Sequence, residues 1–129
     1  MDINNDYGQT TSAADVQNQI NLMEQYFETG ETLSVDFRLR QLRRLQSYLL
    51  AHEREALEAL HADLGKSEFE SYATELGLVY DEIRLYLKKL RQWAKPRHVP
   101  TSLAHFPSSS TVYPYPFGVA AVLSPWNYP

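Results

Sequence analysis

The chain has 129 residues, of which 43% are hydrophobic, and this is enough for one domain with an apolar core. Its formal net charge of -4, with 22% charged residues, argues against nucleic acid as the main partner. The sequence contains no cysteine, which excludes disulfides, thiolate metal sites and a cysteine nucleophile within it. Its 4 histidines lack metal-ligand spacing, so no metal site is predicted.

The first segment, residues 1–11, is polar and has no periodicity, and we predict that it is disordered. It lacks the basic start and the apolar core of a signal peptide. No run in the sequence reaches the length of a membrane span, so no membrane segment is predicted. These features favour a cytoplasmic location.

A helical segment is predicted over residues 12–95. Ser12, with Asp15 three residues later, has the pattern of an N-cap, and Gly30 is the predicted end of the first helix. A narrow apolar stripe runs along one face of this helix and consists of Val16, Ile20, Met23 and Phe27. Such a stripe has to be buried against another part of the molecule.

Ser34 predicts the start of a second helix, in which leucines recur at spacings of three and four as far as Gly65. Gly65 is the predicted C-terminal cap. The sequence Ala51-His52-Glu53 interrupts this pattern. Residues 35–64 therefore form either one long helix with a bend or two shorter helices.

A third helix is predicted from about Ser67 to Ala94, because Pro96 disfavours helical backbone at the residue before it. Gly77 lies inside this helix, where glycine costs roughly 1 kcal/mol of helix propensity relative to alanine. We interpret Gly77 as a point of close packing against a neighbour. Three carboxylates in this helix do not share one face, and we interpret them as solvated: Glu68, Glu70 and Glu75.

The composition then changes, and residues 96–110 are predicted to be an extended, proline-rich connector. In residues 111–129 we predict a hairpin of two strands, 111–113 and 119–123. The second strand is apolar without alternation, as in a parallel sheet that helices cover on both faces. Two strands cannot form that sheet, so further strands would have to come from sequence absent here or from another chain.

The sequence ends with Pro125-Trp126-Asn127-Tyr128-Pro129. The two prolines fix φ on both sides, so a turn between them can present the amide of Asn127 reproducibly to a pocket. Taken alone, this pattern is also that of a proline-rich turn after a strand.

Residues 116–129 closely resemble the P-x-G-V-x-x-x-x-x-P-W-N-Y-P segment of the aldehyde dehydrogenases. Upstream stretches resemble, in order and spacing, the N-terminal helices of the class 3-like branch of this family: residues 38–49, 60–67, 69–76, 81–83 and 93–96. The resemblance covers roughly residues 12–129. It implies an α/β family fold, of which this chain supplies about three helices, a short β-hairpin and the start of the nucleotide-binding and active-site region over 111–129.

The resemblance implies an oxidoreductase that uses NAD or NADP to oxidise an aldehyde to a carboxylic acid, and it implies a homo-oligomer. By the same resemblance, Asn127 is the catalytic residue whose side-chain amide donates to the aldehyde oxygen. Ser124, Pro125 and Trp126 would lie along the nucleotide, mainly through backbone atoms, and Tyr128 would line the aldehyde pocket. Trp126 and Tyr128 have an alternative role as aromatics that bury area at a domain junction.

In this family the nucleophilic cysteine, its general base and most of the nucleotide site lie downstream of the segment that matches residues 116–129. We therefore expect this chain to be an N-terminal fragment of the enzyme and to be inactive alone, since it contains no cysteine. The alternative is a non-enzymatic helical interaction module left by a truncated or split gene. In that case its terminal strand would be an unpaired edge.

Overall fold

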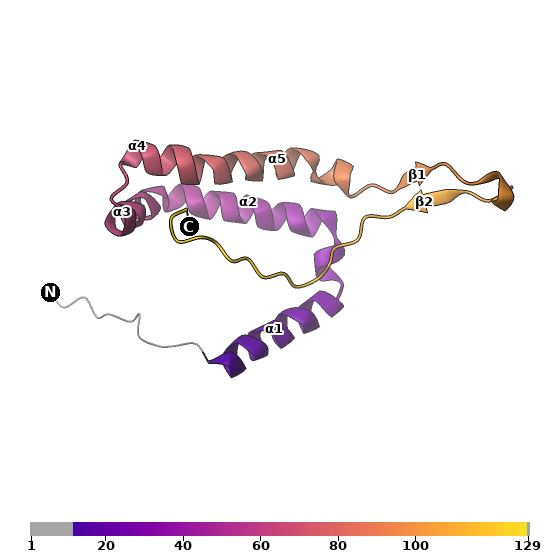
Figure 1. Ribbon diagram of the computed structural model, residues 1–129, viewed down its shortest axis with the longest axis horizontal. Helices are drawn as coiled ribbons and strands as arrows, with labels where there is room; N and C mark the ends of the chain where they lie inside the picture. The colour runs from indigo at the N-terminus through magenta and orange to yellow at the C-terminus, as the bar shows by residue number, and fades with distance from the viewer. Residues whose placement is uncertain (1–11, 129) are drawn as a thin grey trace.

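The structure is a computed structural model that describes residues 12–128. It is mainly helical and ends in a short antiparallel hairpin and an extended segment (Figure 1). The helices are α1 Ala13–Glu28, α2 Val35–Ala51, α3 Glu53–Leu64, α4 Glu68–Ser71 and α5 Gly77–Trp93, and the strands are β1 Arg97–Val99 and β2 Ser110–Val112. This confirms the predicted fold class. The predicted disorder of residues 1–11 lies outside the described residues.

Serine side chains begin the helices where the sequence predicts them. Ser12, Ser34 and Ser67 each accept a hydrogen bond from the backbone N–H three residues later. Such bonds satisfy amide donors that have no partner in the first turn of a helix. Gly30 and Gly65 follow the ends of α1 and α3 with φ of 78° and 66°, a left-handed conformation that glycine adopts without steric penalty.

The second predicted helix is broken at His52, where φ and ψ are -114° and 19°. Residues 35–64 therefore form two helices, α2 and α3, and not one long bent helix. The ring nitrogen Nδ1 of His52 lies 2.8 Å from the carbonyl oxygen of Tyr48, so the side chain of the break residue contacts the last turn of α2. The direction of the chain changes here, and α3 leads toward α4 (Figure 1).

The third predicted helix runs through α4 and α5 with a π-helical turn, Tyr72–Leu76, between them. Gly77 follows this turn, and a Cβ atom there would lie 2.9 Å from the carbonyl oxygen of Tyr72. Gly77 is closely packed, but against Tyr72 of its own helical stretch and not against a neighbouring element. A π turn inserts one residue into a helix and displaces the carbonyls that precede it.

The core lies where α2 packs alongside α5 (Figure 1). Its buried apolar side chains are Leu39, Leu76, Tyr80 and Ile83. Many other large apolar side chains are exposed, so these helices offer more apolar surface than they bury against one another. No helix in residues 12–128 is both long enough and apolar enough to cross a membrane.

The hairpin pairs different segments from those predicted. β1 and β2 are antiparallel, with Arg97 opposite Val112 and Val99 opposite Ser110. The predicted pairing of 111–113 with 119–123 was wrong, because the partner of β2 lies in the predicted connector. Pro114 and Pro116 follow β2 and lack the N–H donors that a tight hairpin at this position would use.

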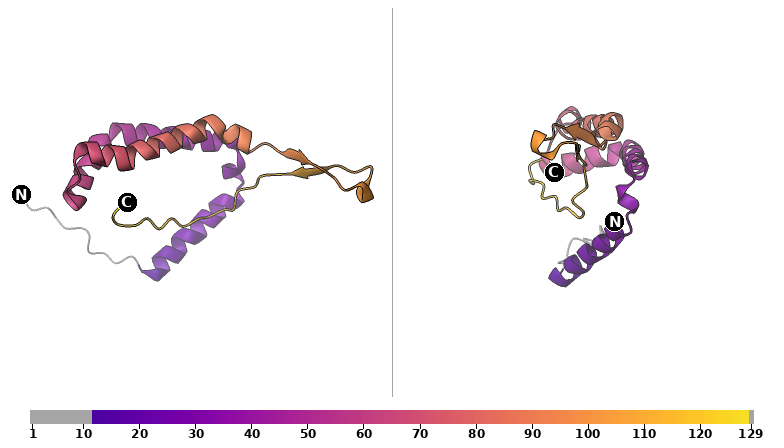
Figure 2. Two further views of the ribbon diagram at one scale, coloured as in Figure 1. Left: turned by 45° about the horizontal axis from the view of Figure 1, so that its top comes forward. Right: turned by 90° about the vertical axis from the view of Figure 1, so that its right-hand side faces the viewer.

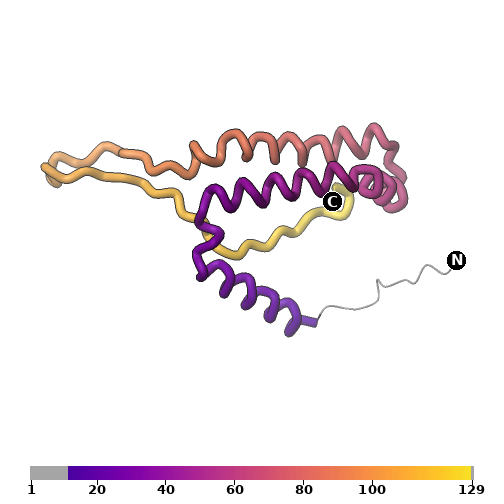
Figure 3. The backbone as a smooth tube through the Cα atoms, turned by 180° about the vertical axis from the view of Figure 1, so that it is seen from behind, coloured from indigo at the N-terminus to yellow at the C-terminus, as the bar shows by residue number. Residues whose placement is uncertain are grey.

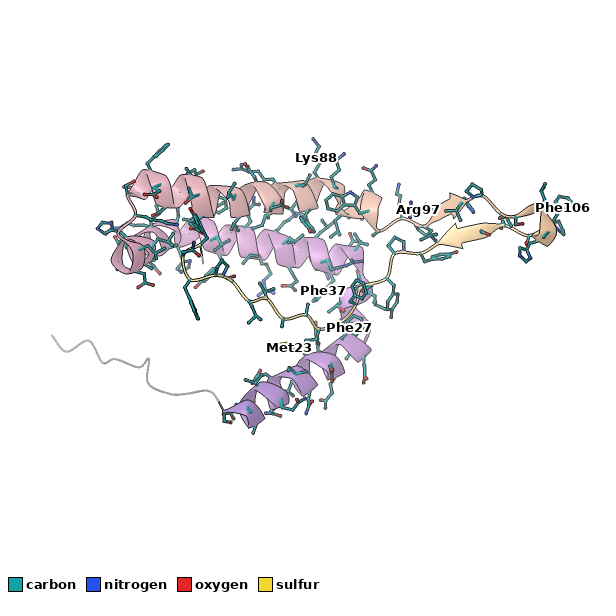
Figure 4. The ribbon with its side chains drawn as sticks, in the orientation of Figure 1. Met23, Phe27, Phe37, Lys88, Arg97 and Phe106 are labelled. Atoms are coloured by element: carbon teal, nitrogen blue, oxygen red, sulfur yellow. The ribbon has the colours of Figure 1, made fainter. Side chains whose placement is uncertain are left out.

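Residues 119–123 are extended but form no strand with any other described residue. The segment after β2 instead runs back between α1 and α2 toward the end of the molecule that holds α3 (Figure 3). On its way it contacts α1: a Cβ atom at Gly118 would lie 3.6 Å from the ring of Phe27. Met23 and Phe27 of α1 face this segment (Figure 4), and both line a hollow together with Pro116.

Candidate active site

The residues predicted to form the active site end the extended segment, near the junction of α3 and α4 (Figure 2). They form a turn in which the backbone N–H of Tyr128 donates to the carbonyl oxygen of Pro125, at 3.2 Å. This bond spans three residues, as in a β-turn. The predicted turn is confirmed, and it places Trp126 and Asn127 at its two central positions.

Lys66 connects this turn to the helices. Its ammonium nitrogen lies 2.5 Å from Oε1 of Glu75 and 3.4 Å from the backbone oxygen of Asn127. The same nitrogen lies 4.3 Å from the centre of the Tyr128 ring, within the range of a cation–π contact. A single side chain from the α3–α4 junction thus contacts a carboxylate, a peptide oxygen and an aromatic face.

The position of Lys66 follows from the residues on either side of it. Gly65 ends α3, with its N–H bonded to the carbonyl oxygen of His61 at 2.9 Å. The His61 ring nitrogen Nδ1 lies 2.8 Å from the carbonyl oxygen of Lys66. Ser67 then caps α4. Lys66 is therefore held between the end of one helix and the start of the next.

Glu75 lies in the π turn, and its side chain is only 13% exposed. The prediction that Glu75 is solvated was wrong, because its carboxylate pairs with Lys66 at the inner side of the helix. Glu68 and Glu70 are exposed, as predicted. The prediction assumed a regular α-helix, and a π turn changes which residues share a face.

Asn127 is exposed, and none of the hydrogen bonds within residues 12–128 involves its side chain. Its amide N–H groups are therefore available to an acceptor from outside this part of the chain. Ser124, Pro125 and Trp126 line a hollow of about 720 Å³ together with Asn127. The Trp126 side chain is 94% exposed, so the ring packs on none of the described elements.

Tyr128 faces a different surface from this hollow. It lines an apolar groove that includes Ala56 and Leu60 of α3 and Val79 of α5. Tyr72 begins the π turn that leads into α5. The centre of its ring lies 6.3 Å from that of Tyr80, which belongs to the core. Four of the five predicted site residues thus form the turn at residues 125–128 and Ser124 directly precedes it, and the five are divided between a hollow and a groove.

Sequence reasoning missed Lys66 and Glu75 as members of the site. The available signal was the position of Lys66 directly between Gly65, which ends α3, and Ser67, which begins α4. For Glu75 the π turn gave no recognisable signal in the sequence.

Residues 6–129 match the aldehyde dehydrogenase family, and the chain belongs to this family. An aldehyde dehydrogenase of Craterostigma plantagineum is 39% identical over 118 residues, which are 92% of this chain and 25% of that protein. Aldehyde dehydrogenase family 3 member H1 of Arabidopsis thaliana is 38% identical over 117 residues, or 91% of this chain and 24% of the relative. These relatives confirm the resemblance to the class 3-like branch.

In Staphylococcus aureus, 4,4'-diaponeurosporen-aldehyde dehydrogenase is 38% identical over 104 residues, 81% of this chain and 23% of that enzyme. A solved structure described as the substrate-bound state of Staphylococcus aureus AldH superposes with a TM-score of 0.73 at 35% identity. It covers 76% of this chain and 21% of its own. The chain thus spans about a quarter of the length of the curated relatives that it matches.

Proposed function

We propose that this chain forms part of an NAD(P)-dependent aldehyde dehydrogenase that oxidises an aldehyde to a carboxylic acid. Membership of the family supports this chemistry. The observation that carries the proposal is the turn at residues 125–128, which Lys66 contacts from the α3–α4 junction while the side-chain amide of Asn127 makes no hydrogen bond among the described residues.

Asn127 is the proposed catalytic residue. When a nucleophile adds to an aldehyde, the carbonyl oxygen gains negative charge, and a donor already aimed at that oxygen lowers the barrier. An amide suits this role because it is uncharged and offers two N–H donors. Loss of one such donor typically lowers kcat by about 100- to 1,000-fold.

Ser124, Pro125 and Trp126 are the proposed nucleotide contacts. Their hollow has room for part of a planar group, and the exposed face of Trp126 offers an aromatic surface. Bound NAD or NADP would accept the hydride that leaves the substrate carbon. Tyr128 is the proposed contact for the aldehyde, since it borders the apolar groove beside α3 and α5.

The sequence contains no cysteine, so a thiolate nucleophile would have to come from outside these 129 residues. We therefore propose that the chain by itself has no dehydrogenase turnover. A homo-oligomeric state and a cytoplasmic location stay predictions.

The proposal is tested by purifying the natural polypeptide from its source cells with an antibody against residues 12–95. Its intact mass and its rate of aldehyde-dependent NAD or NADP reduction are then measured, with the recombinant 129-residue chain assayed in parallel. A species several times heavier than 14.9 kDa that reduces the nucleotide supports the proposal. An inactive species of 14.9 kDa contradicts it and favours the helical interaction module, whereas turnover by the recombinant chain overturns the proposed inactivity.

A further inference from the structure

We propose that Lys66, oriented by Glu75, is a positioning residue that holds the turn carrying Asn127 in one place. This inference rests on the proposed function, because it assigns Lys66 a role that acts through Asn127. Lys66 itself contacts the backbone oxygen of Asn127 and the ring of Tyr128, and it is not assigned any contact with the reacting atoms.

The turn has few other restraints. Within residues 12–128, the bond from Lys66 to the Asn127 oxygen is the hydrogen bond that joins the segment after residue 118 to the helices. Leu123, which precedes the turn, is 96% exposed, and Trp126 within the turn is 94% exposed. Apart from the ring of Tyr128 in its groove, apolar packing does little to fix the turn, and the contacts of Lys66 become the main restraint.

The three contacts of Lys66 form one arrangement. Its side chain is 10% exposed and that of Glu75 is 13% exposed, so both charges are largely removed from water. A buried ion pair is favourable only when its geometry is good and its remaining donors are used. Here the ammonium group of Lys66 contacts the carboxylate of Glu75 on one side, and the Asn127 oxygen and the Tyr128 ring on others. This arrangement favours a specific position of the turn more than it favours overall stability.

Fixing the backbone of Asn127 restricts where its amide can reach. The peptide oxygen of residue 127 is held by Lys66, the ring of residue 128 lies over the same ammonium, and the Tyr128 N–H closes the turn on Pro125. A donor that is already in position needs no reorganisation when charge develops on the substrate oxygen. Displacing such a group by about 1 Å can reduce the rate by about 100-fold.

The direct test uses NMR on the recombinant 129-residue chain. We expect backbone order parameters at Asn127 and Tyr128 near about 0.85 in the unaltered chain and below about 0.6 in Lys66→Met, with α5 unchanged in both. Lys66→Arg should restore part of the order, since it keeps the charge for Glu75 and the ring. Glu75→Gln should lower the order as Lys66→Met does.

A matched control is Lys88→Met, because Lys88 is exposed and points away from the core on α5 (Figure 4). This variant should leave the turn ordered. A second signature is the chemical shift of the Lys66 ε-methylene protons, which the Tyr128 ring should displace upfield and which Tyr128→Leu should return to the ordinary value. Order parameters at residues 127 and 128 that Lys66→Met leaves unchanged, or that are already low in the unaltered chain, would overturn the inference.

A kinetic cycle in the natural enzyme separates this inference from the proposed function. Lys66→Met should lower kcat by about 10- to 100-fold, and by less than about twofold when Asn127→Ala is already present. Additive losses would mean that Lys66 does not act through Asn127, which overturns the inference and leaves the proposed function intact. An unchanged kcat in Asn127→Ala alone would overturn the proposed function, while the NMR result still decides whether Lys66 holds the turn.

Discussion

The hydroxyl of Tyr80 donates a hydrogen bond to Oε2 of Glu53, 2.9 Å away, and joins α5 to the start of α3. Tyr80 is only 1% exposed, although its hydroxyl reaches the edge of the core. Burial, and then the hydrogen bond to Glu53, raises the pKa of Tyr80 to about 12. The folded chain therefore favours the neutral phenol.

This pKa predicts a loss of stability at high pH. Tyrosine in an unfolded chain titrates near about 10, so between pH about 10 and about 12 the folded state binds more protons than the unfolded state. The free energy of unfolding then falls as the pH rises through that window. Tyr80→Phe should remove this part of the pH dependence and, at neutral pH, lower the free energy of unfolding by about 1.5 to 3 kcal/mol.

The measurement is urea unfolding, followed by circular dichroism, at a series of pH values. Tyr86→Phe is the matched control, because Tyr86 is 44% exposed on the same helix and should leave the slope as it is. The interpretation of Tyr80 fails if Tyr80→Phe and the unaltered chain lose stability equally between pH about 10 and about 12.

Leu39 is expected to carry a large share of the stability of the helices. It is 1% exposed and lies on α2 where that helix packs against α5. Leu39→Ala should lower the free energy of unfolding by about 2 to 5 kcal/mol, the usual range for a buried leucine. Leu50→Ala, at a position 56% exposed on the same helix, should change it by less than about 1 kcal/mol. Equal effects in thermal unfolding of the two variants would contradict this view of the core.

Gly77→Ala should destabilise the chain although alanine is the better helix former. The added Cβ would lie 2.9 Å from the Tyr72 carbonyl oxygen, which is backbone and cannot rotate away. The gain in helix propensity of about 1 kcal/mol is therefore outweighed by a steric clash. As a reference, Ser47→Ala at an exposed position of α2 should be neutral or slightly stabilising. A higher melting temperature for Gly77→Ala than for the unaltered chain would show that the π turn relaxes.

The helix boundaries could be predicted because they depend on local chemistry. Ser12, Ser34 and Ser67 bond to amides three residues away, and Gly65 supplies a left-handed backbone that few other residues adopt. The strand pairing could not be predicted in the same way. The partner of Thr111 is His98, and such a choice depends on contacts between distant segments. A helix cap can be recognised from four consecutive residues of the sequence, whereas the pairing of two strands cannot.

The site could be predicted only in part, for a related reason. The turn at residues 125–128 follows from its prolines, and the structure forms it. The contact of Lys66 with Asn127 spans 61 residues, and no local pattern indicates it. The burial of Glu75 depends on the π turn, which a regular helical period does not anticipate. The position of Lys66 beside the turn and the burial of Glu75 thus depend on the folded structure, and local sequence patterns do not indicate them.

The most direct test of the proposed function is the steady-state kinetics of Asn127→Ala in the natural enzyme. Asn18→Ala is the matched control, because Asn18 is exposed on α1, far from the turn in the sequence. We predict that Asn127→Ala lowers kcat for aldehyde oxidation by about 100- to 1,000-fold, and that Asn18→Ala leaves it unchanged. A kcat for Asn127→Ala equal to that of the unaltered enzyme would contradict the assignment of Asn127 as the donor to the substrate oxygen.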